Sequence, residues 1–124
     1  MDQIVLTIPR ERDFSAIANL VVAGIGSRHD FTLDAIDDLQ LAVESLVEHD
    51  EDDEAIVLRL SIDQGTLRIL VGPFDRETIA PELAADGEEL GLRRVLAATV
   101  DEVGLTEQDG ASWIELRKRV TVKA

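Results

Sequence analysis

Residues 38–49, with the sequence DLQLAVESLVEH, carry the strongest structural signal in the chain. Apolar residues recur here every three or four positions, which is the spacing of one buried face of an α-helix. Thr32 is expected to cap this helix, and Phe31 precedes the cap in a position to pack on Ile36. The buried face is predicted to consist of Ile36, Leu39, Ala42, Val43, Leu46 and Val47.

The acidic run at residues 48–54, EHDEDDE, follows directly. Repulsion among its carboxylates is expected to end the helix, so we interpret most of the run as a solvated loop. A calcium loop is the alternative, although the run lacks the glycine and the spaced terminal glutamate of such loops.

Alternating apolar residues predict strands on both sides of this helix. Residues 3–8 form the first expected strand, which Pro9 ends. Residues 55–62 and 66–71 are expected to pair around a tight turn at residues 63–65, and Gly72-Pro73 to break the second strand. A last hairpin is predicted from residues 102–106 and 112–120.

Helical spacing predicts two further helices, at residues 13–27 and 88–100. Residues 74–87 are interpreted as a linker with one short helical turn around residues 77–84. The inner stripe of the first helix is predicted to be Phe14, Ile17, Leu20, Val21 and Ile25, and that of the last helix Leu92, Val95, Leu96 and Val100.

This element order predicts an α+β fold in one domain, residues 1–124. The simplest arrangement is a two-layer sandwich, in which helices cover one face of a mostly antiparallel sheet.

Composition restricts the classes of partner. The formal net charge of −14 repels phosphate groups, so we expect no nucleic acid and no membrane as partners, and a basic protein surface is the better match. Cysteine is absent, and no leader or membrane-spanning stretch is visible, so a cytoplasmic location is expected.

Three segments carry local patterns of a known family: DLQLAVESLVEH at residues 38–49, LRILVGPFD at 67–75 and GEELGLRRV at 87–95. In this order they resemble the anti-sigma-factor serine kinases of the histidine-kinase-like ATPase superfamily, over almost the whole chain. The resemblance implies that superfamily's fold, ATP and Mg²⁺ as cofactors, and a sigma factor or an anti-anti-sigma protein as partner.

In the first segment the family has a catalytic glutamate and, four residues later, a magnesium-binding asparagine on the same helical face. Aligned without gaps, Ser45 and His49 stand at these two positions. A shift of one residue offers Glu44 and Glu48 instead. The resemblance thus makes Glu44 and Glu48 the candidate catalytic residues, and their alternative is a solvated helix face.

The other two segments match the family in part. Gly72 and Asp75 belong to a remnant of the adenine-binding motif whose first aspartate is missing; Asp75 is alternatively a turn residue before a short helix. Gly87, Gly91 and Leu92 match the glycine-rich start of the helix that covers the phosphates, where backbone amides approach the ligand. Glu89 replaces the central glycine, so carboxylates stand where phosphate is expected.

All three segments depart from the family at residues that contact ATP. We therefore expect a regulatory domain that binds a protein partner around the helix of residues 38–49 and the linker, with ATP binding weak or lost and no cofactor. The alternative is an active ATP-dependent serine/threonine kinase that uses Glu44 or Glu48 as base. A homodimerisation platform is a third reading, and no metal ligands can be assigned.

Overall fold

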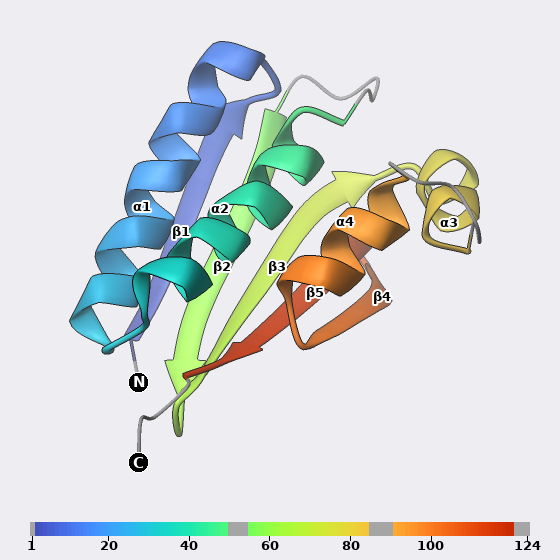
Figure 1. The fold of residues 1–124 in the computed structure, drawn as a ribbon. Coiled ribbons are helices and arrows are strands. Elements are labelled where there is room, and N and C mark those ends of the chain that lie inside the picture. Colours follow the sequence, from blue (N-terminus) through green and yellow to red (C-terminus); the bar gives the residue numbers. More distant parts are fainter. Residues whose placement is uncertain (1, 50–54, 85–90, 121–124) are drawn as a thin grey trace.

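The computed structural model describes residues 2–49, 55–84 and 91–120. Within these ranges, five antiparallel strands form one sheet in the order β1-β2-β3-β5-β4, and α1, α2 and α4 cover one of its faces (Figure 1). The elements are β1 (Asp2–Pro9), the short 3-10 turn η1 (Arg12–Phe14), α1 (Ser15–Arg28), α2 (Leu33–Val47), β2 (Ala55–Asp63), β3 (Thr66–Phe74), α3 (Arg76–Ala84), α4 (Leu92–Thr99), β4 (Glu102–Gln108) and β5 (Ala111–Arg119). The expected α+β sandwich is confirmed.

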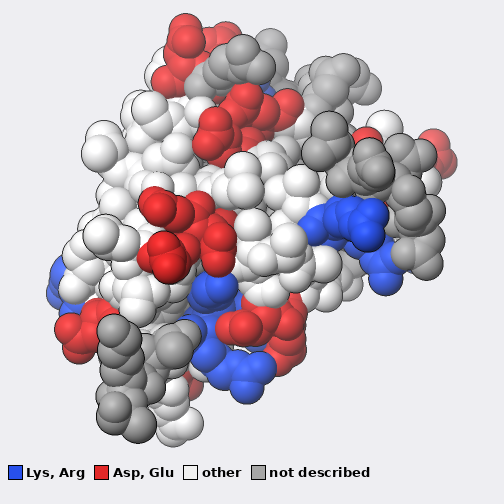
Figure 2. Space-filling view, in the orientation of Figure 1, with Lys and Arg blue, Asp and Glu red and all other residues white. Residues whose placement is uncertain are grey.

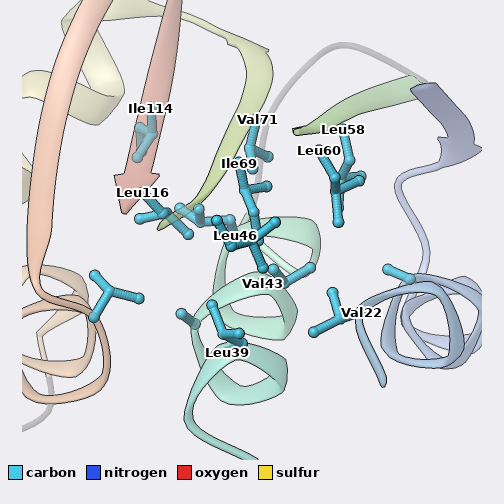
Figure 3. Close-up of a cluster of buried hydrophobic side chains, with 14 of the residues drawn as sticks. Val22, Leu39, Val43, Leu46, Leu58, Leu60, Ile69, Val71, Ile114 and Leu116 are labelled. Atoms are coloured by element: carbon cyan, nitrogen blue, oxygen red, sulfur yellow. The ribbon is translucent and has the colours of Figure 1, made fainter. Parts of the chain in front are cut away.

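Helix α2 forms as its sequence predicts. The Ala35 amide donates a hydrogen bond to Thr32 Oγ1 at 3.1 Å, which satisfies one of the orphan donors at the helix start. The predicted inner face is buried against the sheet, where Leu39, Val43 and Leu46 meet aliphatic side chains of β2, β3 and β5 (Figure 3). This layer is the core of the described part of the chain.

Both hairpins turn on two residues with positive φ. Gln64 and Gly65 have φ of 50° and 79°, and Asp109 and Gly110 have φ of 54° and 78°. Two such residues in sequence make the tight turn whose twist matches that of paired strands. Strand β2 alternates between buried and exposed residues, as predicted.

The predicted inner stripe of the first helix is right at Ile25, which is buried, and at Phe14 and Val21, which pack partly buried against the core. It is wrong at Leu20, which is 73% exposed, and at Ile17, which is also exposed; Ala18 and Val22 are buried instead. Apolar residues surround this helix, so their spacing does not select one face. The small residues select the buried face. A Cβ atom added at Gly26 would lie 2.8 Å from Ile36 Cγ1, so glycine permits the close approach of α1 to α2.

The predicted end of β3 is also wrong. The strand continues through Gly72-Pro73 to Phe74, with a shift in its pairing to β5 between Val71 and Phe74. A proline lacks the amide donor of a regular ladder, and an irregularity at this place accommodates it. As a result, Phe74 stays in the sheet layer. The helical turn expected at residues 77–84 of the linker is confirmed as helix α3, Arg76–Ala84.

Helix α4 is described from Leu92, and Leu96 and Val100 are buried at its inner side as predicted. Lys118 of β5 links this helix to α2: its Nζ donates to Thr99 O at 2.8 Å and lies 3.5 Å from Asp38 Oδ2. None of the described helices is long and apolar enough to cross a membrane.

Candidate functional site

The C-terminal end of α2 faces α3. His49 Nε2 pairs with Glu82 Oε2 of α3, and the His49 ring meets the Phe74 ring edge-on, with 5.8 Å between centroids and 79° between planes. The side chain of His49 is 12% exposed. The residue that stands at the family's magnesium-binding position is therefore engaged with a carboxylate and an aromatic ring.

Phe74 is also contacted by Arg10, which follows β1. The Arg10 guanidinium donates to Pro73 O, and its Cζ lies 4.8 Å from the Phe74 centroid. Phe74 is 2% exposed, and Ile79 of α3 is fully buried. In the described part of the chain, these side chains occupy the region between the end of α2 and the start of α3. We call Arg10, His49, Phe74 and Glu82 the α2–α3 cluster.

Sequence reasoning did not find two members of this cluster. Arg10 lies 63 positions before Pro73, and Glu82 lies 33 positions after His49. Neither belongs to a motif, and both meet their partners only through the fold. Nothing in the sequence marks these two charged residues, one directly after the first strand and one on the linker helix, as parts of a site.

Ser45 and the two glutamates take different positions. Ser45 Oγ donates to Leu41 O of its own helix at 2.8 Å. Glu44 lies about 100° from Ser45 around the helix, and Glu48 ends the helix one turn after Glu44. The structure thus brings His49 to α3 and does not place Glu44 on the face of Ser45. The catalytic role of Glu44 and Glu48 stays a prediction.

Gly72 and Asp75 each have a structural role. A side chain at Gly72 would lie 2.6 Å from Trp113 Cδ2, so this glycine makes room for the indole on the sheet face opposite the helices. Asp75 Oδ1 accepts the Glu77 amide at 3.0 Å, which is a cap at the start of α3. The alternative reading of Asp75, as the residue before a short helix, agrees with this contact.

The third segment lies partly outside the described residues, which exclude Gly87 and Glu89. Gly91 is the N-cap of α4 in an extended conformation, and its carbonyl accepts the Arg94 amide at 3.0 Å. Leu92 packs against the core, half-buried. Both residues thus begin an ordinary helix, and their nucleotide-site role is untested.

Among the described residues, no three or more histidine and carboxylate side chains come together in a group that could hold a metal ion. Most of the acidic run, residues 50–54, lies outside the described residues. The predicted calcium alternative for that run is therefore untested.

The uncovered face of the sheet carries an ion-pair network. Glu115 accepts hydrogen bonds from Arg68 and Arg117, and Arg117 also lies 3.7 Å from Glu102. Burial by itself raises the pKa of the Glu115 carboxyl, but the hydrogen bonds and charges of Arg68 and Arg117 outweigh burial and hold the pKa below its usual range. The network keeps two guanidinium groups side by side on adjacent strands.

Comparison with known proteins gives relatives along nearly the whole chain. Serine-protein kinase RsbW of Listeria monocytogenes serotype 4a is 31% identical over 133 aligned positions, which cover 91% of this chain and 85% of that protein. Serine-protein kinase RsbW of Bacillus velezensis is 26% identical over 135 positions, covering 90% and 82%. No family model matches the sequence.

A solved structure agrees on the fold. The RsbU and RsbW domains of a Mycobacterium tuberculosis protein superpose on all of this chain with a TM-score of 0.73 at 15% identity. This chain spans 34% of that longer chain. The backbone likeness confirms the predicted fold, and the sequence identity to the Listeria protein over most of both chains establishes kinship. The chain therefore belongs to the RsbW family of anti-sigma-factor serine kinases.

Proposed function

We propose that this chain is a regulatory domain that binds a protein partner and has weak or no ATP binding. The observation that carries the proposal is the α2–α3 cluster. His49 stands where the family resemblance puts a magnesium-binding asparagine, and it is engaged with Glu82 and Phe74. ATP would have to displace these contacts, and the Phe74 contact to Arg10 with them.

The residues present do not fit Mg-ATP. Ser45 replaces a carboxylate with a hydroxyl that is bonded to its own helix. The imidazole of His49 pairs with a carboxylate, whereas magnesium prefers oxygen ligands. Gly72, which the resemblance links to adenine binding, accommodates Trp113 on the face of the sheet away from the helices. These three contacts support a loss of nucleotide binding.

Helix α2 offers a surface for a protein partner. Leu33 is 79% exposed and Leu41 is 50% exposed, and Asp37 lies between them one turn from each. Exposed leucines in line with carboxylates favour an amphipathic partner with basic residues. By family membership, the candidate partners are a sigma factor and an anti-anti-sigma protein, which agrees with the docking face expected around this helix.

The second candidate is an active serine kinase. The relatives at 26% to 31% identity are named serine-protein kinases, and this favours retained activity. Glu44 or Glu48 would then be the catalytic base. If the chain phosphorylates a protein substrate, Glu44→Ala or Glu48→Ala is expected to remove phosphoryl transfer and keep the fold. Asp63→Ala is the matched control, because Asp63 is an exposed carboxylate at the end of β2, outside the proposed docking helix.

Calorimetric titration with Mg-ATP and with ADP separates the two candidates, with Listeria RsbW titrated alongside as the comparison protein. We expect no heat of binding and an unchanged Tm for this chain. Micromolar binding that requires magnesium would overturn the proposal. At ligand concentrations about a hundredfold above Kd, such binding would stabilise the fold by about 2.7 kcal/mol, which a thermal-shift scan resolves.

The partner surface is tested separately with purified sigma and anti-anti-sigma proteins from the same cell. Leu41→Lys should weaken binding by about tenfold or more if α2 is the docking face. Leu20→Lys is the matched control, because Leu20 is an exposed leucine on α1. Equal loss in both variants would contradict a specific role for α2.

A further inference from the structure

A second surface lies on the far side of α4 from α2. In the described part of the chain, a groove of about 440 Å³ runs between α3, α4 and β4. Leu83 and Ala97 line its helical walls, and Val103, Gly104 and Leu105 line the strand side. Helix α4 packs against both α2 and β4 and lies between them (Figure 1).

Strand β4 is the outer strand of the sheet, so one of its sides has no strand partner among the described residues. The two-residue turn at Asp109 and Gly110 makes Gln108 and Ala111 a hydrogen-bonded pair. Bonded and non-bonded pairs alternate from there along the ladder. The backbone amides and carbonyls of Val103, Leu105 and Glu107 therefore point outward from the sheet.

The side chains of the same edge are apolar and accessible. Val103 and Leu105 are 38% and 36% exposed, and they pair across the ladder with Leu116 and Ile114, which are buried under the helices. They therefore point to the groove side of the sheet. Natural edge strands usually carry lysine or proline that blocks further pairing, and β4 has neither. An open edge beside an apolar groove is the geometry that binds an extended peptide.

The net charge of the chain favours a basic occupant of this edge. The groove itself is lined by one acidic and one basic residue, Asp101 and Arg93. Glu102 and Glu107 flank the strand residues and are paired in part with Arg117 and Arg76. Basic side chains gather over α4 (Figure 2), where the helix carries Arg93 and Arg94. The chain as a whole, however, has a formal net charge of −14. The field of the protein therefore attracts a cationic segment.

We infer that the edge of β4 and the groove beside it bind an extended segment of another protein, in which aliphatic and basic residues alternate. The segment adds a strand to β4 through the outward groups of Val103 and Leu105 and inserts an aliphatic side chain between Leu83 and Ala97. A groove of this volume holds such a side chain. The inference rests on the proposed function, in that it names a second partner surface for the same regulatory domain.

The test uses a fluorescein-labelled peptide, acetyl-KVKIKVK-amide, and fluorescence anisotropy with the full chain. Ala97→Phe fills the groove and is expected to weaken binding by about tenfold or more. Ala98→Phe is the matched control, since Ala98 is the next exposed residue of the same helix and does not line the groove. It should keep the affinity of the parent chain within about twofold.

Two peptide controls need no folded variant. A scrambled peptide of equal charge, KKKVIVK, should bind at least about tenfold more weakly, and methylation of alternate amides in the original peptide should abolish pairing with β4. Equal binding of the original and scrambled peptides, or of the Ala97→Phe and Ala98→Phe variants, would overturn the inference. Self-association that excludes the peptide and that Ala97→Phe removes would overturn it too, because a second copy would then be the occupant.

These results are independent of the nucleotide titration and of the α2 variants. If the peptide does not bind, while Mg-ATP also does not bind and the partner still binds on α2, only the inference about the β4 groove is refuted. Magnesium-dependent ATP binding refutes the proposed loss of nucleotide and leaves the peptide measurements unchanged.

Discussion

Gly72→Ala separates two explanations of a glycine that stands in a remnant of an adenine-binding motif. If glycine is present for a nucleotide, a methyl group here affects binding and leaves stability nearly unchanged. If glycine is present for Trp113, the same methyl group destabilises the fold. The geometry favours the second outcome, because the added Cβ would lie 2.6 and 2.8 Å from two atoms of the indole ring.

The magnitude follows from the displacement that the methyl group requires. Carbon atoms in contact prefer about 3.5–4.0 Å, so the ring must move by roughly 1 Å. Trp113 is 8% exposed and also lies under the Arg59 guanidinium, 5.3 Å from Cζ to the ring centroid, so its movement is opposed. Overpacking of this kind costs about 1–3 kcal/mol. Reduced freedom of the unfolded chain returns about 0.4–1 kcal/mol, which leaves a net loss near 1–2 kcal/mol.

Urea denaturation measures this loss. With an m-value of about 1–3 kcal/mol/M, the midpoint should fall by roughly 0.3–2 M. Gly104→Ala is the matched control: Gly104 also lies in a strand, and an added Cβ there meets nothing within 4 Å. In a Trp113→Leu background, the cost of Gly72→Ala should shrink. An unchanged midpoint, or a cost that Trp113→Leu does not relieve, would refute the packing explanation.

Two other substitutions test features that the structure explains. Thr32→Ala removes the hydroxyl that accepts the Ala35 amide, and thermal unfolding should show a loss of about 1 kcal/mol, which Thr32→Ser should largely avoid. Glu115→Gln removes a carboxylate whose pKa is depressed, and should cost about 0.5–1 kcal/mol near neutral pH. A depressed pKa contributes stability that is fully present above the unfolded value of about 4.3 and is lost as pH falls through the lower folded value. Urea titrations of the two chains should therefore converge as the pH falls below about 4. A difference that persists at low pH would argue against the ion pairs with Arg68 and Arg117.

Helix α2 and both hairpins could be predicted from the sequence because local signals agree there. A capping threonine, an apolar stripe and two-residue turns each involve neighbours in the chain. Helix α1 could not be oriented in this way. Its large residues Ile17 and Leu20 have the spacing of a core face, yet close packing of Ala18 and Gly26 determines which side is buried. Packing of this kind depends on partners that a periodicity does not include.

The candidate site was predictable only in its α2 residues. The pattern around Ser45 and His49 marks a departure from the family, but it does not say what replaces the lost interactions. Glu82 and Arg10 supply the replacement, from a linker helix and from the end of β1. The run through Gly72-Pro73 was misjudged for a related reason, since proline normally ends a strand and here the strand continues after a shift in register.

The site and the core use different faces of α2, and this explains how one can change without the other. Leu39, Val43 and Leu46 are fully buried against the sheet, whereas Ser45 and His49 lie on the flank and are only half-buried. Restoring the family pair alone, as Ser45→Glu with His49→Asn, should therefore leave the fold intact and still give no Mg-ATP binding by calorimetry. Phe74 remains buried under Arg10 and still occupies the space beside position 49. Measurable affinity in this double variant would instead mean that the two substituted residues are the whole obstacle, and that the α2–α3 cluster opens readily for a ligand.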